Sequence, residues 1–530
     1  MKQNDDVIFS DDTHRTKGRD AQRNNIMAAK ILSQTLATTL GPKGMDKLLM
    51  DPYGNITVTN DGVTIMRQMK MDHPVAKMIV EVAKNQEEAV GDGTTTVVVL
   101  AGELLRQAEL LLDKGIHPTT IAKGYRMAEE KAQLALESIA FPVNSTNLDI
   151  LRNIALTAMT GKGSEARRDH LASLVVSAIQ KSMSNVMVFP ERVSDVVTVT
   201  GISGRNTSDS YLINGAVLEK ERVLESMPNN VEGRIALFSC DVDVPKSDAS
   251  SLNLTDSGQY QELLENEQKA YEELVGYLIQ NDIKIVVTER GVNDLIAHRL
   301  AQRDVMVIKR VSRTDMARIA QATKTSVNGE VKLSIRYSEG ALAHEMKQGD
   351  SRYIIIQPIE PNSIVSLIVY GGTSHHTQEL KRATEDALGD LFATLRCGKA
   401  VAGAGSGELA IAKQVRDFAE TIKGKEQLCV MAYAEALESI PLALAENSGL
   451  DAIECLTNLR ILHKKGEAQM GLNVVNGNPM DAWKVGVVEP LDPKRCALAS
   501  ATEAAEMILR IDDVLLGTPK PIQNNELPQA

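Results

Sequence analysis

The 530-residue sequence has few aromatic side chains and no closely spaced cysteines. Phe, Trp and Tyr together make up 3% of the residues, with a single Trp, whereas the hydrophobic fraction as a whole is 43%. We therefore expect a core built from Ala, Val, Ile, Leu and Met. The five cysteines include no CxxC pair, which argues against a structural zinc or a redox motif and favours buried thiols in a reducing cytosol.

The sequence also lacks an obvious membrane or export signal. The first 20 residues are polar and of mixed charge, without the apolar segment of a signal peptide. No uninterrupted apolar run approaches the ~20 residues that span a bilayer, so we expect a cytoplasmic protein. The net charge of −12 repels nucleic acid and anionic membranes, and neither is an expected partner.

Hydrophobic spacing divides the chain into a helical part, an α/β part and a second helical part. Apolar residues recur at helical spacing through most of the first third. In the middle, the β-branched runs Ile283–Thr288 and Val305–Ile308 flank a helical stretch, which predicts a strand–helix–strand domain. From Gln378 the pattern is helical again to about Asp513. The simplest architecture inserts an α/β domain into a helical one.

Two segments interrupt this pattern. Asn55–Ile65 alternates around Asn60-Asp61-Gly62, which is a signal for a β-hairpin turn. Lys246–Gln259 is polar and precedes an amphipathic stretch that continues to Leu278. The polar segment fits either a plain surface loop or the base of a projecting arm.

The strongest local motif is Gly91-Asp92-Gly93-Thr94-Thr95-Thr96, between two helical stretches. The two glycines permit a tight backbone path, and the threonines fall where the next helix begins. The amides and hydroxyls of a helix N-terminus can bind phosphate, and the Asp92 carboxylate suits Mg²⁺. The alternative is an ordinary glycine-rich turn with a threonine cap.

Three further motifs are weaker. Gly41-Pro42 reads first as a helix stop with a rigid turn, although it also lets backbone approach a ligand closely. Asp386 lies at the edge of an apolar helical stripe, where a solvated charge is the ordinary interpretation. The turn around Gly405 could pack against a nucleotide base or simply join two helices.

Several well-known site motifs are absent. The sequence contains no GxxxxGK[ST] phosphate loop, no GxSxG and no HExxH. Gly161–Ala166 formally matches a dinucleotide fingerprint, but it follows the helical stretch Leu151–Met159 and not a strand, so we reject that interpretation. The nine histidines form no arrangement typical of metal ligands.

Together these pieces resemble the chaperonin family, and specifically its group II branch of archaeal thermosomes and the eukaryotic cytosolic chaperonin. The motifs occur in family order and at family-like separations. They are LGPKGMDK (Leu40–Lys47), NDGVTI (Asn60–Ile65), VGDGTTTVV (Val90–Val98), EDAL (Glu385–Leu388), VAGAG (Val401–Gly405) and SATEAAEMILRIDDV (Ser500–Val514).

The resemblance implies a multidomain α and α/β subunit with three parts. A mostly helical equatorial ATPase domain would comprise residues 1–144 and 404–530. A small intermediate hinge domain would comprise 145–213 and 369–403. An inserted α/β apical domain, 214–368, would bind clients and carry a helical lid protrusion at about 245–278.

The resemblance also implies roles for individual residues, with ATP and Mg²⁺ as the cofactors. Asp386 would activate the attacking water, with Asp61 as a second carboxylate beside the γ-phosphate, and Asp92 would hold Mg²⁺. The remaining nucleotide contacts would be Gly41 and Pro42 through backbone, Gly93, Thr94, Thr95 and Thr96 around the phosphates, Lys162 as a γ-phosphate sensor, and Gly405 and Glu489 at base and ribose.

The function implied is ATP-driven protein folding in a stacked double ring of identical or paralogous subunits, with unfolded proteins as clients. Hydrolysis would require the hinge domain to close on the equatorial domain. Two alternatives are a ring subunit with a structural or regulatory role and weak ATP cycling, and a small-molecule kinase with an unusual phosphate loop. The family usually has glycine where this chain has Ala404, whose methyl group would lie close to adenine.

Overall fold

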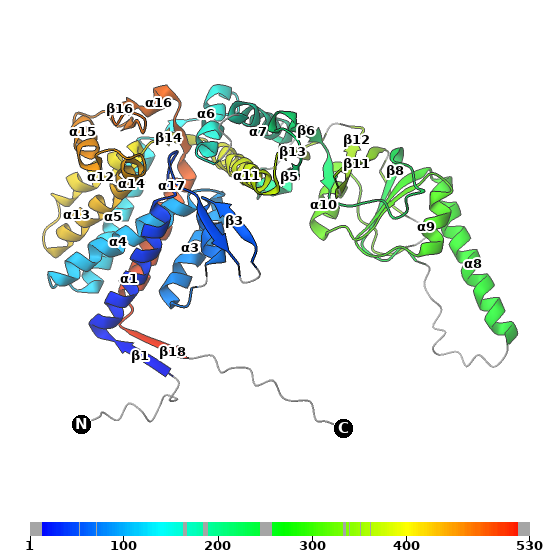
Figure 1. The fold of residues 1–530 in the computed structure, drawn as a ribbon, viewed down its shortest axis with the longest axis horizontal. Coiled ribbons are helices and arrows are strands. Elements are labelled where there is room, and N and C mark those ends of the chain that lie inside the picture. The colour runs from blue at the N-terminus through cyan, green and yellow to red at the C-terminus, as the bar shows by residue number, and fades with distance from the viewer. Residues whose placement is uncertain are drawn as a thin grey trace. The chain divides into compact units, whose positions relative to one another are not determined.

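The computed structural model of the protein forms two compact units, Met1–Gly161 with Ala393–Ala530, and Lys162–Phe392 (Figure 1). The first is therefore discontinuous in sequence and the second is continuous. The residues that the structure describes are 13–51, 54–69, 71–162, 167–183, 189–243, 257–331, 335–338, 340–349, 351–360 and 362–517.

The first unit is mainly helical. Its helices are α1 (Gly18–Ala37), α2 (Gly62–Gln68), α3 (Pro74–Val90), α4 (Thr94–Asp113), α5 (Pro118–Ser138), α6 (Leu148–Met159), α12 (Ser406–Ala419), α13 (Lys425–Leu437), α14 (Ser439–Asn447), α15 (Ala452–Lys464), α16 (Ala482–Val485) and α17 (Leu491–Leu509). The last long helix, α17, packs on α3, α4 and α5, so the two ends of the sequence share one core.

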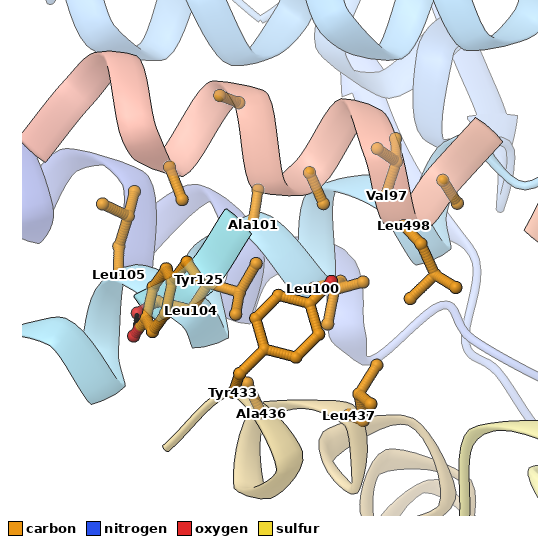
Figure 2. Packing of buried hydrophobic residues seen from close by; sticks show 14 of the residues in the cluster. Val97, Leu100, Ala101, Leu104, Leu105, Tyr125, Tyr433, Ala436, Leu437 and Leu498 are labelled. Carbon is orange, nitrogen blue, oxygen red and sulfur yellow. Dashed lines mark hydrogen bonds between the residues drawn. The ribbon is translucent and has the colours of Figure 1, made fainter. Parts of the chain in front are cut away.

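Helix α4 is central to this core because it is apolar around most of its circumference. Twelve of its 20 residues are buried, and it contacts α1, α3, α13 and α17. Figure 2 shows α4 side chains from Val97 to Leu105 packed with residues of α5, α13 and α17. The two tyrosines there, Tyr125 and Tyr433, meet edge to face with ring centroids 5.7 Å apart. The remainder of this core is aliphatic, as expected.

Short two- and three-stranded sheets complete the first unit. β1 (Thr13–Lys17) pairs antiparallel with β18 (Asp513–Gly517), which places the first and last described strands side by side (Figure 1). β14 (Lys399–Ala402) lies between β17 (Val488–Pro490) and β4 (Phe141–Pro142). The remaining pairs are β2 (Lys47–Met50) with β3 (Ile56–Thr59), and β15 (Met470–Leu472) with β16 (Pro479–Asp481).

The hairpin predicted around Asn60-Asp61-Gly62 is wrong in register. β3 ends at Thr59 and pairs with the preceding strand β2, so the hairpin turn falls between Met50 and Ile56. Asp61 is instead the N-cap of α2. Asn, Asp and Gly favour both turns and helix caps, and the alternating pattern alone could not separate the two.

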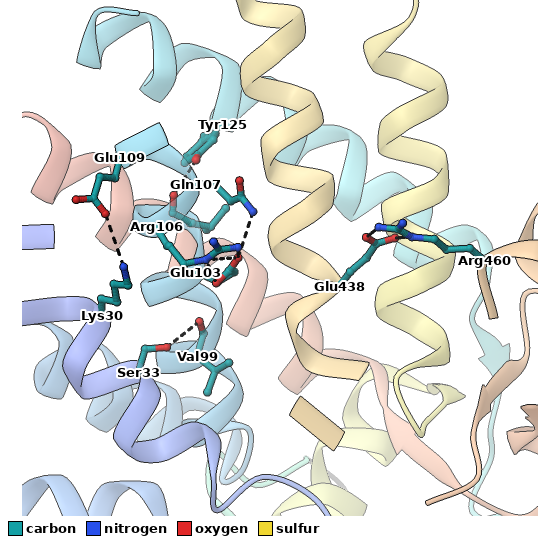
Figure 3. Close-up of polar contacts among 11 residues, drawn as sticks. Lys30, Ser33, Val99, Glu103, Arg106, Gln107, Glu109, Tyr125, Glu438 and Arg460 are labelled. Atoms are coloured by element: carbon teal, nitrogen blue, oxygen red, sulfur yellow. Dashed lines mark hydrogen bonds and ion pairs between the residues drawn. The ribbon is translucent and has the colours of Figure 1, made fainter. Parts of the chain in front are cut away.

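A buried charge cluster joins three helices of the first unit. Glu438, between α13 and α14, is 2% exposed and forms ion pairs with the guanidinium groups of Arg416 and Arg460. Figure 3 shows its pair with Arg460. Burial alone would raise the pKa of Glu438, but the two guanidinium groups together outweigh burial and lower it. The cluster fixes the junction at which α14 begins.

One stretch qualifies the expectation that no apolar run could span a bilayer. Among the described residues, Lys425–Asn447, which covers α13 and α14, is long and apolar enough to cross a membrane, judged by length and composition alone. Its apolar window is 72% buried inside the protein. A core helix of a soluble protein passes the same test, and both helices contribute side chains to the cores of the first unit.

The second unit is built around two sheets. A six-stranded sheet has the order β10-β9-β8-β11-β12-β7, and a three-stranded sheet has the order β5-β13-β6. The strands are β5 (Val197–Ser203), β6 (Tyr211–Asn214), β7 (Ala216–Leu218), β8 (Asn230–Phe238), β9 (Ile283–Thr288), β10 (Met306–Ile308), β11 (Ala341–Gln348), β12 (Ser351–Pro358) and β13 (Val365–Gly371). The helices are α7 (Arg168–Met183), α8 (Ser257–Gln280), α9 (Asp294–Ala301), α10 (Arg313–Ala322) and α11 (Ser374–Cys397), with short 3₁₀ turns at Val193–Asp195 and Thr207–Asp209.

Alternation along β8 explains why the six-stranded sheet has helices on both faces. Ile235 and Leu237 pack in one cluster with α10, whereas Ala236 and Phe238 pack in another with α8 and α9. β8, β9 and β10 are parallel, as the strand–helix–strand pattern predicted. The predicted α/β part is therefore confirmed.

The predicted projecting segment is only partly within the described residues. The described chain resumes at Ser257, where α8 begins, so most of Lys246–Gln259 lies outside it. The C-terminal half of α8 is amphipathic as predicted, with Tyr271, Leu274 and Leu278 buried against the sheet. The three-part domain division remains a prediction beside the two units observed.

Candidate functional site

The glycine-rich segment after α3 forms an open helix N-terminus. Gly91 and Gly93 have φ angles of 81° and 80°, in the left-handed region that glycine adopts without a Cβ penalty. α4 begins at Thr94, and its N-cap Gly93 supplies no side-chain cap. The first amides of α4 therefore keep their hydrogen-bonding capacity at the positive end of a 20-residue helix. This confirms the predicted position of the threonines at a helix start.

Asp61 and Gly62 lie directly against this helix start. Asp61 Oδ2 accepts hydrogen bonds from the Thr64 amide at 2.9 Å and the Thr64 hydroxyl at 2.5 Å. A Cβ placed on Gly62 would lie 2.7 Å from Thr95 Oγ1, so only glycine fits without moving the threonine hydroxyl. The N-cap role of Asp61 thus holds a carboxylate beside the threonines.

Gly41 and Pro42 reach the same region through Asn60. The Asn60 side-chain amide donates to the Gly161 carbonyl at 2.7 Å. A Cβ on Gly161 would lie 3.0 Å from both the Gly41 carbonyl oxygen and Pro42 Cα. Gly161 therefore connects the turn that follows α1 to the segment that contains Asp61.

A residue that no local sequence pattern predicts anchors this turn. Asn447, at the end of α14, donates from its side-chain amide to the carbonyls of Ala37 and Leu40 at 2.8 Å each. It lies more than 400 residues away in sequence, so no local pattern could have indicated it. Its hydrogen bonds satisfy carbonyls at the end of α1.

The glycine-rich turn before α12 follows a strand, whereas a loop between two helices had been the alternative. β14 ends at Ala402 and α12 begins at Ser406. Gly405 and Ala404 have φ angles of 75° and 57°, so Ala404 is a non-glycine residue in the left-handed region, which costs about 1–2 kcal/mol. The strand β17 pairs with β14 and places Glu489 opposite Val401.

Glu489 lies beside this turn. A Cβ on Gly403 would be 2.7 Å from Glu489 Oε1, and the other carboxylate oxygen is 2.5 Å from Lys494 Nζ. Burial raises the pKa of Glu489; the charges of Glu408 and Asp92 act in the same direction, and Lys494 opposes them.

Gln86 connects the glycine-rich loop to the first turn of α17, and no local sequence pattern predicts this role. It is 1% exposed, and its side-chain amide donates to the carbonyls of Asp92 at 3.1 Å and Pro493 at 3.0 Å. A Cβ on Gly93 would lie 3.1 Å from the same nitrogen. The glycine-rich loop is thus fixed to the start of α17.

In the second unit the structure brings Lys162 and Asp386 together. Lys162 Nζ lies 2.5 Å from Asp386 Oδ2, and the two side chains are 20% and 24% exposed. Asp386 lies on α11 beside a buried stripe that contains Ala383 and Ala387. This confirms its predicted position at the edge of the stripe.

Comparisons with known proteins show the family of the chain. The model of the TCP-1/cpn60 chaperonin family matches residues 32–519. A thermosome subunit of Methanopyrus kandleri is 45% identical over 96% of this chain and 94% of its own length. The chain belongs to the TCP-1/cpn60 chaperonin family.

Other relatives of this chaperonin chain place it in the thermosome branch. The thermosome subunit beta of Methanothermobacter thermautotrophicus is 44% identical over 96% of this chain and 94% of its own length. The thermosome subunit alpha of Halobacterium salinarum is 43% identical over 96% and 91%, respectively. The resemblance to group II chaperonins is therefore confirmed.

The predicted site residues of this chaperonin chain fall into two groups in the structure. Gly41, Pro42, Asp61, Asp92, Gly93, Thr94, Thr95, Thr96, Gly405 and Glu489 belong to the first unit, and Lys162 and Asp386 form a pair in the second. Their individual roles remain predictions.

Proposed function

We propose that this chaperonin subunit binds ATP in the first unit and uses its hydrolysis to drive protein folding. The observation that carries the proposal is the uncapped N-terminus of α4, where Gly93 and three threonines stand beside Asp61. Backbone amides at a positive helix end, together with hydroxyls, suit the phosphates. The turn around Gly405 and the Glu489 carboxylate would take the base and the ribose.

The carboxylates of this region suit Mg²⁺. Magnesium bound to nucleotide is usually held by one or two carboxylates together with phosphate oxygens. Asp92 precedes the threonines in the sequence and Asp61 caps the neighbouring helix α2, so this region offers two carboxylates. No group of three metal-ligating side chains occurs among the described residues, in keeping with a metal held largely by phosphate and water. When bound, Mg²⁺ would neutralise the charge that develops on the phosphates.

We assign the water-activating role to Asp386. Phosphoryl transfer needs positioning, charge neutralisation and a water in line with the leaving group. A carboxylate with its direction fixed by Lys162 suits that task. Because the two residues lie in a different unit from the phosphate loop, we propose that turnover requires a change of conformation, which couples hydrolysis to shape.

Assembly into rings has its own support in the first unit. The hairpin β2–β3 has only two strands and exposes Leu48, Met50, Ile56 and Val58, each 42% exposed or more. A two-stranded hairpin is marginal alone, and exposed apolar side chains on it mark a contact surface. We propose a neighbouring subunit as the partner in a cytoplasmic stacked double ring, with unfolded proteins as clients.

A phosphate-release assay combined with negative-stain imaging tests the proposal. Purified protein should form rings, release phosphate from ATP in a Mg²⁺-dependent manner, and change ring shape when ATP is added. Rings that release no phosphate would favour the alternative of a structural ring subunit, which the comparisons do not support. A small monomer that phosphorylates a metabolite would instead favour the kinase alternative.

A further inference from the structure

Lys494 is a buried lysine shared by two carboxylates. It lies in the first turn of α17, and its side chain is 12% exposed. Its Nζ is 2.5 Å from Glu408 Oε1 and 2.5 Å from Glu489 Oε2. An ammonium group is costly to bury unless it is paired. Although burial lowers the pKa of Lys494, the two carboxylates outweigh burial and raise it, so the lysine stays charged.

The two carboxylates differ in their surroundings. The Glu408 side chain is 8% exposed, and its second oxygen is buried without a hydrogen-bond partner among the described residues. The Glu489 side chain is 32% exposed, and its second oxygen lies beside the Gly403 turn. Glu408 thus serves as an internal anchor, whereas the second oxygen of Glu489 lies beside the turn at Gly403.

The backbone that carries Lys494 is fixed to the phosphate loop. The carbonyl of the preceding residue, Pro493, accepts a hydrogen bond from Gln86, which also binds the Asp92 carbonyl. A shift of Lys494 would therefore move both the Glu489 carboxylate and, through Pro493 and Gln86, the backbone at Asp92.

We propose that Lys494 is a positioning residue of the nucleotide site, where its ammonium group, anchored by Glu408, holds the Glu489 carboxylate in the orientation that accepts a hydrogen bond from a ribose hydroxyl. The inference rests on the proposed ATP-binding function and makes it more specific. Without the lysine, two close carboxylates would repel each other and Glu489 would turn away from the Gly403 turn.

The test compares ADP with its 2′,3′-dideoxy analogue by isothermal titration of the assembled protein. The unmodified protein should bind ADP about tenfold more tightly than the analogue, the value of one good hydrogen bond to a charged acceptor. Lys494→Met should weaken ADP binding about tenfold and leave analogue binding nearly unchanged. The ratio of the affinity for ADP to the affinity for the analogue should therefore fall towards one. Lys494→Arg should restore part of the ratio.

Two controls separate positioning from stability. Lys413→Met removes a lysine from an exposed pair with Asp417 on α12 and should leave the ratio unchanged. If circular dichroism shows that Lys494→Met does not fold, Glu408→Gln removes the anchor instead and should also lower the ratio.

The outcomes distinguish the inference from the function on which it rests. An unmodified protein that binds no ADP overturns the proposed function and the inference together. An unmodified protein that binds ADP and the analogue equally overturns the inference alone. Equal weakening of both ligands in the folded variant, with the ratio preserved, shows a purely structural lysine and also overturns the inference.

Discussion

Lys162 Nζ and Asp386 Oδ2 lie 2.5 Å apart in the second unit. The pair joins the residue that follows Gly161 to the middle of α11, 224 positions later in the sequence. Because both side chains are at most a quarter exposed, solvent screens their attraction less than it would a surface pair. The lysine therefore fixes the direction in which the carboxylate points.

Replacement of Asp386 should separate binding from hydrolysis. We expect Asp386→Ala to bind ATP with nearly unchanged affinity and to hydrolyse it about 10²- to 10⁴-fold more slowly, because the group that activates water is lost. Phosphate release and equilibrium binding of ATP measure the two effects. Normal turnover in this variant would contradict the assignment.

The neighbouring residue provides a matched control. Glu385 lies on the same helix, is about half exposed and forms a loose pair with Lys381 at 3.8 Å. Glu385→Ala removes a carboxylate of similar charge and should change the rate by less than about twofold, because a surface pair contributes little. An equal loss in both variants would indicate damage to α11 instead of lost chemistry.

Gly62 lies so close to the threonines that adding one methyl group to it, as in Gly62→Ala, should weaken ATP binding. Gly62→Ala would place a Cβ 2.7 Å from Thr95 Oγ1 and should displace that hydroxyl. We expect ATP affinity to fall about tenfold, whereas the melting temperature should change little, since alanine suits a helix start. Gly276→Ala, where no atom lies within 4 Å of the new Cβ, should leave affinity unchanged.

Ala404 should be a strained position. Its φ of 57° is costly for a residue with a Cβ, so Ala404→Gly should stabilise the first unit by up to about 1 kcal/mol. Scanning calorimetry should show a rise in melting temperature of about 1–2 °C for a unit of this size. Gly405→Ala should have the opposite effect, since its Cβ would meet Pro441 at 2.9 Å. A lower melting temperature in Ala404→Gly would disprove the strain.

The Glu438 cluster should make stability depend on pH. The pKa of Glu438 is lowered in the folded protein, so its contribution is complete above the unfolded value of about 4.3 and is lost as pH falls through the folded value. We expect Glu438→Gln to cost about 2 kcal/mol at pH 7, and the difference from the unmodified protein to shrink below about pH 4. Urea unfolding at several pH values measures this.

A surface carboxylate serves as the comparison for that experiment. Asp417 is 62% exposed and pairs with Lys413 on the same helix. Asp417→Asn should change stability by less than about 0.5 kcal/mol at either pH. If Glu438→Gln lost the same stability well below pH 4 as at pH 7, the carboxylate charge would not be the cause.

The sequence predicted the local features of the site well. The helix start at Thr94, the helix containing Asp386 and the parallel strands Ile283–Thr288 and Met306–Ile308 all follow from periodicity and glycine placement, which depend on nearby residues. Prediction failed at Asp61, because a hairpin turn and a helix cap use the same residue types and the pairing of β3 with β2 decides between them.

The residues that support the site could not have been found in this way. Gln86 donates to a carbonyl 407 positions away, and Asn447 to one 410 positions away. Each looks like an ordinary polar residue in a helical pattern, and its meaning comes only from the backbone that the fold brings next to it. Such buried amides are visible only as satisfied hydrogen bonds.

The division of the chain also sets an order of events during synthesis. The second unit is a single stretch, Lys162–Phe392, whereas the first needs α17 and the final strand β18 to complete its core and its terminal sheet. Because the ribosome releases the N-terminus first, the second unit can fold before the first unit is complete. The core of residues 1–161 stays incomplete until α17 has been synthesised, so its apolar side chains remain exposed for longer than those of the second unit.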